Sequence, residues 1–575
     1  MFRKNEQHLQ GALISDVQQL GEKQRRRLEE SWAGTFYREF FCRIQEEAFA
    51  VLYADEPSRP NVPVNVLVGL EALKAGFGWS DEQMHDAFTF DLQVRYALGY
   101  RNLSEGQFDL RTVYNFRQRL SRYNLAQGSN LLAQAFAAIT TEQLTAFQVR
   151  TGKQRMDSTQ IASHMLDMSR VQLAVEALQR LTRLLGESER ARYAELLEPY
   201  TQGKSGQVVY RIKGREEATR WLQQIGQVLH SLLGAMAESY AQEPVYKTVQ
   251  RLFEEHFRVE EQKVAVRPGE ELPPDSLQSL DDQEATYRRK GQRSYKGYVA
   301  NVTESCDSDN ALQLITHVQV APNHVDDSVL LVEALPELSA RTQLDTLITD
   351  GSFGSLKADE ALQAHHVEQI QTGLRGHAPN PQHWSLADFD ITQDEAGVPL
   401  RLGCPQGQAV QVERSGDSFV AHFDPVTCGQ CPHHQSERCQ TKPGRHDPRF
   451  HLYFTQRKVF SAKRRQRYLA HQQDGKNLRV AVEATVRSLK HPFRGHLLVR
   501  GQFRVSCLMI ATALMVNVRR IQHYLQTKPA PSVGTPLQGA ENSAQAGQNL
   551  FVFALNTFQR TLQRLFQLSK PCFSC

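Results

Sequence analysis

The order of strand-like and helix-like stretches between residues 146 and 372 constrains the fold of this chain most strongly. It runs strand, long helical excursion, two strands, helix, strand and short strand. The strand candidates lie at 155–161, 295–304, 312–322, 344–350 and 367–371, and helical spacing fills 165–260 and 324–338. This order is typical of a mixed sheet covered by helices, so we expect an α/β core.

Two acids occupy similar places in this pattern. Asp157 lies in the strand candidate "QRMDSTQI", and Asp350 ends the apolar stretch "DTLITD" before "GSFGS". An acid at the carboxyl end of a strand and followed by glycine commonly faces a crevice, although such a residue can also be an ordinary turn residue. If the two strands are neighbours, the carboxylates repel each other unless a cation is present. Oxygen ligands suit Mg²⁺ or Mn²⁺, and two such ions support phosphoryl transfer.

A strongly basic segment holds a third acid. From Lys442 to Arg504 there are sixteen Lys and Arg residues and three acids, one of which is Glu483. Helical spacing places Glu483 on one face with three cations, Arg479, Arg487 and Lys490. That face could supply a metal ligand together with contacts to phosphates. The alternative is surface salt bridging of Glu483 with Arg479 or Arg487.

The remaining composition favours a polyanionic partner in a reducing compartment. The net charge is only +4 over 575 residues, so the basic excess is local. The N-terminus is too polar for a secretory signal, and the apolar stretch 505–518 is shorter than the roughly 20 residues that span a bilayer. Nine cysteines do not make a disulfide scaffold in a chain of this length. We therefore expect a cytoplasmic protein without membrane contact.

The region 64–120 reads as several short helices. Ser80 is a suitable N-cap for one of them, and a third helix begins near Asp109 with a polar and basic sequence. This arrangement indicates a helix-turn-helix-like domain that binds DNA, and the alternative is an ordinary helical bundle. The candidate DNA contacts on the third helix are Arg111, Asn115, Arg117 and Arg119.

Four cysteines gather in a stretch that we predict to be rich in loops, between about 373 and 450. They are Cys404, Cys428, Cys431 and Cys439. The C-x2-C spacing in the middle of this set lets two thiolates bind one ion, so we expect a structural Zn²⁺ site. Three histidines could replace a cysteine ligand: His422, His433 and His434. The alternative is four reduced thiols without metal, and a further C-x2-C at Cys572 and Cys575 stays unassigned.

The order D…D…E, with the third acid in R-x3-E-x6-K, resembles the DDE transposases of bacterial insertion sequences. The stretches "MDSTQI", "DGSFGS" and "RGQFRVSCLMIATALMVNVRRI" are similar to that family, as is the helical region from "RPNVPVNVLVGL" to "LRTVYNFRQRL". The cysteine insert resembles the eleven-eighty-two-like group, and the resemblance covers about 40–525. The family pattern has Tyr three residues before the Arg, whereas this chain has Lys476 there.

The resemblance implies an RNase H-like catalytic core in which Asp157, Asp350 and Glu483 hold two Mg²⁺ or Mn²⁺ ions. It implies binding of terminal inverted repeats in double-stranded DNA, cleavage of the DNA ends and their joining to target DNA. Arg479 and Lys490 would contact this DNA. Two ends must be handled together, so we expect at least a homodimer on DNA, associated with the bacterial nucleoid. A DNA-binding relative without catalysis, domesticated or repressor-like, and a nuclease of the same fold that cannot join strands remain alternatives.

The expected organisation has seven parts. They are a helical DNA-binding and dimerisation domain at 1–145, a first core strand region at 146–164, a helical insertion and linker at 165–290, the RNase H-like core at 291–372, a cysteine-rich insert at 373–455, the catalytic helix and end of the core at 456–525, and a linker with a C-terminal helix at 526–575.

Overall fold

The computed structural model describes most of the chain up to residue 527. The described residues are 1–527 except 11–13, 55, 57–58, 262, 377–378, 395, 445–446, 474–479 and 494–496. Arg479, Lys476, the predicted terminal helix, Cys572 and Cys575 lie outside the described residues. Contacts divide the chain into a large unit, Met1–His523, and a small one, Tyr524–Cys575. The fold below is that of the large unit.

A six-stranded mixed sheet forms its centre. The strands are β1 (Lys153–Ile161), β4 (Thr286–Lys290), β5 (Arg293–Ser305), β6 (Ile315–Pro322), β7 (Thr346–Thr349) and β8 (Glu368–Gln371). The path is β4-β5-β1-β7-β8, and β6 pairs with the second half of β5. β5 is antiparallel to β1, β4 and β6, whereas β7 is parallel to both β1 and β8. All five predicted strands are present, and the α/β class is confirmed.

Strand β4 was not predicted, because its sequence "TYRRK" has no apolar alternation. It pairs with the start of β5 through the tight turn at Gly291, whose φ is +63°. Glycine adopts this left-handed conformation without steric cost, as a two-residue hairpin turn requires.

Each face of the sheet has its own apolar core. Met156 of β1 and Leu347 of β7 pack under α15 (Asp327–Arg341) and α16 (Leu356–Ala364). Successive strand residues point to opposite faces, so Asp157 lies on the other side. That side is covered by α20 (Val480–Lys490) and α21 (Gln502–Thr527).

The N-terminal helices share a core with the sheet and α21. They are α1 (Asp16–Gln19), α2 (Glu22–Glu29), α3 (Trp32–Glu39), α4 (Val64–Phe77), α5 (Asp81–Phe90), α6 (Leu92–Ala97), α7 (Leu110–Gln127) and α8 (Leu131–Ala146). Ser80 caps α5, as predicted, and Asp109 caps α7. A Cβ at Gly76 of α4 would lie 2.4 Å from Met515 of α21, so these helices approach closely.

Helix α21 is long and apolar enough to cross a membrane by length and composition. Of its most apolar part, however, 67% is buried inside the protein. The side chains of Val505, Met509 and Val518 belong to the shared core. This burial is typical of a core helix.

The predicted helical excursion is a helical insertion with a separate core. It contains α9 (Arg170–Leu184), α10 (Glu187–Arg192), α11 (Ala194–Thr201), α12 (Ser205–Val209), α13 (Gly214–Tyr240) and α14 (Pro244–His256). It ends in a hairpin of β2 (Phe257–Glu260) and β3 (Lys263–Val266), which the sequence did not predict.

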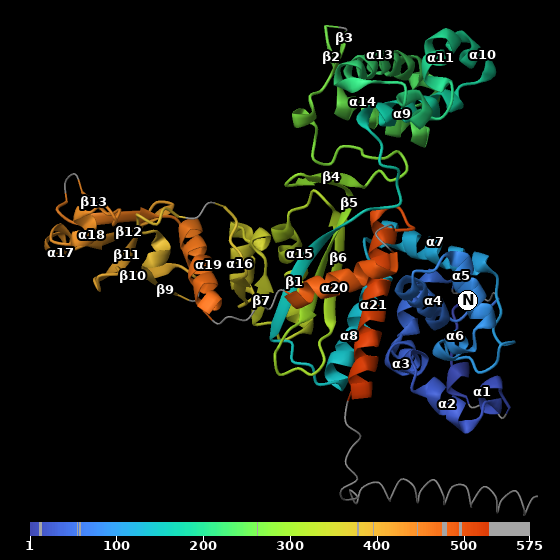
Figure 1. Cartoon of the computed structure of the whole chain (residues 1–575), viewed down its shortest axis with the longest axis horizontal. Helices are drawn as coiled ribbons and strands as arrows, with labels where there is room; N and C mark the ends of the chain where they lie inside the picture. Colours follow the sequence, from blue (N-terminus) through green and yellow to red (C-terminus); the bar gives the residue numbers. More distant parts are fainter. Residues whose placement is uncertain are drawn as a thin grey trace, which may run out of the picture. The chain divides into compact units, whose positions relative to one another are not determined.

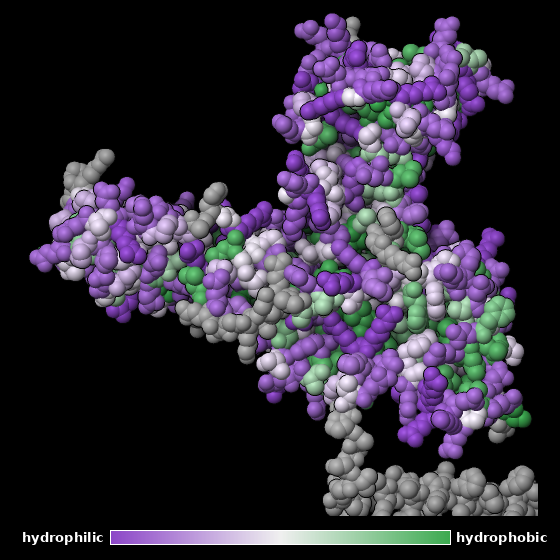
Figure 2. Space-filling view, in the orientation of Figure 1, coloured by the Kyte–Doolittle hydropathy of each residue, from purple (hydrophilic) through white to green (hydrophobic). Residues whose placement is uncertain are grey.

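The prediction that 373–450 is rich in loops and has little core is wrong. The segment holds an antiparallel sheet of β9 (Asp390–Gln393), β10 (Pro399–Gly403), β11 (Ala409–Ser415), β12 (Ser418–Phe423), β13 (Lys442–Pro443) and β14 (Phe450–Phe454). Two short helices, α17 (Pro425–Gly429) and α18 (Pro432–Gln435), lie between β12 and β13. Phenylalanines 389, 419, 423 and 454 fill its core together with Val459 and Ala462 of α19 (Gln456–Gln473). The visible surface of this insert sheet is predominantly hydrophilic (Figure 2).

Candidate active site

The structure brings Asp157 and Asp350 together. β1 and β7 are parallel neighbours in which Arg155 pairs with Ile348. Each acid follows two residues later, so the two acids occupy equivalent positions on adjacent strands. Both side chains line one small cavity, and Val482 of α20 lines it as well. The crevice predicted for the two acids is therefore present.

Local hydrogen bonds fix Asp350. Its Oδ1 accepts a hydrogen bond from the backbone N–H of Ser352 at 2.8 Å and another from the Ser352 hydroxyl. A Cβ at Gly351 would lie 2.8 Å from the carbonyl oxygen of Gly373, so a glycine is needed directly after the acid. The sequence "DGS" thus encodes the tight turn that presents the carboxylate.

Helix α20 packs on β1 and carries the third predicted acid (Figure 1). Val482, Thr485 and Leu489 are buried, whereas Glu483 is exposed and Lys490 is half-buried. Burial lowers the pKa of Lys490, and the negative charge of Asp157 partly opposes this effect. The Lys490 ammonium group therefore lies within electrostatic reach of Asp157.

The three acids do not form a closed cluster. Among the described residues, the one group of three possible metal ligands that lie within 4.8 Å of one another is His422, Asp447 and His451. The structure therefore places Asp157 and Asp350 on a common cavity and Glu483 on the helix above β1, without convergence of all three carboxylates.

A buried carboxylate that the sequence did not single out ties this region together. Glu304 of β5 is fully buried. It accepts hydrogen bonds from Arg155 Nε at 2.5 Å, Thr485 Oγ1 at 2.7 Å and Arg520 Nη1 at 2.8 Å. These donors come from β1, α20 and α21, so one carboxylate joins the strand of Asp157 to the helix of Glu483. We call these four residues the Glu304 network. Its only signal in the sequence is a charged residue at the end of an otherwise apolar and small-residue strand, "YVANVTES".

Three of the four residues that the sequence predicts to contact DNA are exposed on α7. Arg111, Asn115 and Arg119 are exposed, and the Arg119 guanidinium lies 4.8 Å from the centre of the Tyr53 ring. Asn115 and Arg119 also line one open pocket.

Arg117 departs from that prediction. Its guanidinium donates to Glu71 Oε1 at 2.6 Å and to the two carboxylate oxygens of Asp81 at 2.7 and 2.9 Å. These ion pairs raise the pKa of Arg117 although burial opposes them. Arg117 thus links α7 to α4 and α5, and this geometry does not support the predicted DNA contact.

The Arg117 cluster predicts a stability change in acid. Burial alone would raise the pKa of Asp81, but hydrogen bonds from Arg117 and Lys74 outweigh it and lower the value from 3.8 to about 2. A lowered folded-state pKa stabilises the fold above the unfolded value, and that contribution is lost as the pH falls from about 4 to 2. We expect the free energy of unfolding to fall by about 2 kcal/mol over this pH range, as urea unfolding would measure. Asp81→Asn should remove this part of the pH dependence of the free energy of unfolding. An unchanged pH dependence in this variant would contradict the role of Asp81.

The four insert cysteines line one cavity together with His434. Burial raises the pKa of the Cys428 thiol to about 11, and the neighbouring thiols of Cys439, Cys404 and Cys431 add to this effect. The seven described cysteines are free of disulfides. Of the possible histidine substitutes, His433 packs against Trp384, whereas His422 contacts His451 instead.

Residues 26–119 match the family model described as "Transposase domain (DUF772)". The matched range ends within α7 and covers most of the N-terminal helices. It supports a transposase family and suggests a DNA-processing enzyme. No curated protein and no solved structure matches the chain.

Proposed function

We propose that the chain is a DDE transposase that binds the terminal inverted repeats of its insertion sequence, cleaves the DNA ends and joins them to target DNA. The observation that carries the proposal is the equivalent placement of Asp157 and Asp350 on neighbouring parallel strands. In the sheet, β6, β5 and β1 are antiparallel, β7 and β8 run parallel to β1, and β4 extends the edge beside β5. This order supports the RNase H-like core that the family resemblance implies. The transposase-domain match supports the same class independently.

The residues present fit two Mg²⁺ or Mn²⁺ ions. The candidate ligands are hard carboxylate oxygens. Asp157 lies on β1, which is the parallel neighbour of β7 and contacts α20, whereas Asp350 directly follows β7 and Glu483 lies on α20. Two ions lie about 3.5–4 Å apart in such sites, so Asp350 and Glu483 need not approach each other if each binds a different ion. When bound, the ions would activate water or a DNA 3′-hydroxyl and stabilise the leaving oxygen.

The chain's own residues orient the DNA and the acids. Arg487 is exposed on α20, and Lys490 lies near Asp157, so both are available to hold phosphates beside the acids. Arg479 has the same proposed role and lies outside the described residues. The Glu304 network positions Glu483 rather than touching the DNA, because it fixes α20 against β1.

The N-terminal helices would bind the terminal repeats. We propose that α7 acts as the recognition helix of a helix-turn-helix-like domain and that Arg111, Asn115 and Arg119 face the DNA. Arg117 is excluded from this set because protein carboxylates hold its guanidinium. Handling two DNA ends calls for at least a dimer, which would act in the cytoplasm at the nucleoid.

We also propose a structural Zn²⁺ bound by Cys404, Cys428, Cys431 and Cys439. The shared cavity of these thiols supports this role. Cys428→Ser combined with Cys431→Ser is expected to lose one equivalent of zinc and to lower the unfolding temperature of the insert, as metal analysis and thermal unfolding would detect. Equal zinc content in the variant and the wild type would refute this site.

Product analysis separates the proposed function from its two alternatives. Incubation with DNA that carries the repeats of the element and Mg²⁺ or Mn²⁺ should give 3′ ends joined to target DNA. Cleavage without joined products would identify a nuclease of the same fold. Binding without cleavage would identify a DNA-binding relative without catalysis.

A further inference from the structure

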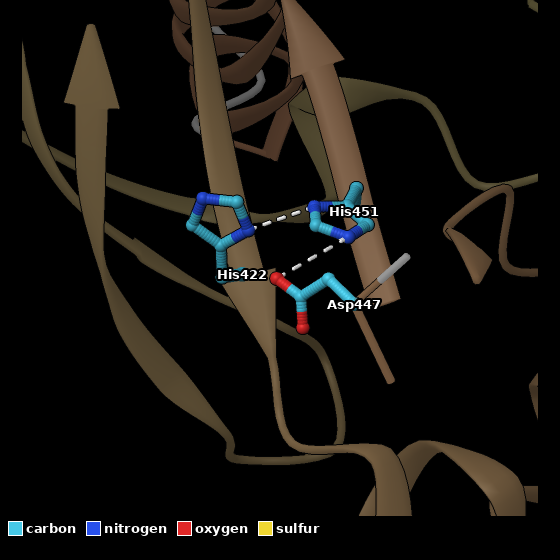
Figure 3. Close-up of side chains that lie close together, drawn as sticks. All are labelled: His422, Asp447 and His451. Atoms are coloured by element: carbon cyan, nitrogen blue, oxygen red, sulfur yellow. Dashed lines mark hydrogen bonds and ion pairs between the residues drawn. The ribbon is translucent and has the colours of Figure 1, made fainter. Parts of the chain in front are cut away.

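A second group of metal-ligand side chains lies on the insert sheet (Figure 3). His422 of β12 and His451 of β14 are direct cross-strand partners, and their Nδ1 atoms are 2.7 Å apart. Asp447 precedes β14, and its Oδ2 is 3.8 Å from His451 Nε2. One ligand atom from each of the three residues lies within 4.8 Å of the others.

This group is separate from the cysteine cavity. Ala421 and Phe423, which flank His422 in β12, belong to the apolar core of the insert, and Phe423 lines the cysteine cavity. Side chains alternate along a strand, so His422 points to the opposite face of the sheet. His451 shares that face because the two histidines are paired.

Each of the two imidazole rings also lies near a carboxylate. The Nδ1–Nδ1 contact uses one proton. His422 Nε2 lies 3.5 Å from Glu413 Oε2, and His451 Nε2 lies 3.8 Å from Asp447 Oδ2, so each Nε2 faces a carboxylate. A bound metal cation would offset the negative charge of these two carboxylates.

We propose that His422, His451 and Asp447 bind a divalent transition-metal ion such as Zn²⁺. Two imidazoles and a carboxylate form a common ligand set for zinc. Small rotations of the three side chains would bring one ligand atom of each residue to the roughly 2 Å from a common ion that zinc requires. The proposal does not rest on the catalytic function proposed above.

The surroundings hold the ligands in place. Arg449 donates to Asp447 Oδ2 from Nη2 at 2.7 Å and from Nε at 2.8 Å, and its backbone N–H donates to Oδ1 at 3.0 Å. A Cβ at Gly444 would lie 2.4 Å from His451 Nε2, so the backbone passes directly beside the ring. Partners that orient ligand side chains in this way commonly raise metal affinity.

Calorimetric titration of the full-length protein with Zn²⁺ tests the site. Wild type is expected to bind one equivalent more than His422→Gln/His451→Gln. Asp447→Asn, which keeps both histidines, should bind that equivalent at least about tenfold more weakly. His164→Gln, a change of an exposed histidine outside the insert, should match wild type.

Cobalt(II) provides a check on folding in the same variants. The thiolate charge-transfer band of cysteine-bound cobalt should be equal in wild type and the double histidine variant, because the two sites lie on opposite faces. Equal stoichiometry and equal affinity for wild type, the double variant and Asp447→Asn would overturn the proposal.

Discussion

Replacing Asp157 or Asp350 with alanine is expected to reduce metal-dependent DNA cleavage by at least about a thousandfold. Both acids line the same cavity, and each would hold an ion that stabilises charge in the transition state. Neither acid lies on α7, so the affinity for the terminal repeats should stay within about twofold of wild type. Single-turnover cleavage and gel-shift titration on the same DNA measure the two quantities separately.

Asp345→Ala is the matched control for this prediction. Asp345 is an exposed acid directly before β7, at the end of the strand opposite Asp350. The Asp345→Ala variant should cleave DNA at the wild-type rate. If Asp157→Ala and Asp350→Ala cleave as fast as Asp345→Ala, the two acids have no catalytic role.

Glu304→Ala is expected to lower the free energy of unfolding of the core by about 3–5 kcal/mol. The side chain is fully buried and accepts hydrogen bonds from Arg155, Thr485 and Arg520. Its removal leaves two arginines without their buried counter-charge and frees α20 from β1. Urea unfolding followed by tryptophan fluorescence and circular dichroism measures the change.

Two further variants make this test specific. Glu360→Ala removes an exposed acid of α16 and should change stability by less than about 0.5 kcal/mol. Glu304→Gln keeps an acceptor oxygen but not the charge. Its free energy of unfolding should therefore lie between those of Glu304→Ala and Glu360→Ala. Equal stability of Glu304→Ala and Glu360→Ala would show that the network does not hold the core together.

The central sheet and two of its acids could be predicted from the sequence, because both depend on local patterns. Apolar stretches gave the strand positions, which the structure shows as strands of four to thirteen residues, and "DGS" after β7 indicated the turn that presents Asp350. Apolar spacing likewise predicted α21, and the N-cap Ser80 predicted the start of α5.

Other features depend on contacts between residues far apart in the chain and could not be predicted from the sequence. Glu304 and Arg520 are separated by 216 positions, so no local pattern reveals their pairing. Arg117 has the spacing of an exposed helix face, yet Glu71 and Asp81 on other helices take up its hydrogen bonds. The insert strands were missed because polar residues on their exposed face interrupt short apolar segments such as "SFVAHF" and "FHLYF".

Anomalous diffraction from crystals of the protein with DNA ends and Mn²⁺ tests the central claim most directly. The proposed active site predicts manganese peaks bounded by Asp157, Asp350 and Glu483, and their loss in crystals of Asp157→Asn. Manganese bound elsewhere, or bound to Asp157 and Asp350 with Glu483 turned away from the DNA and the ions, would contradict the three-acid site.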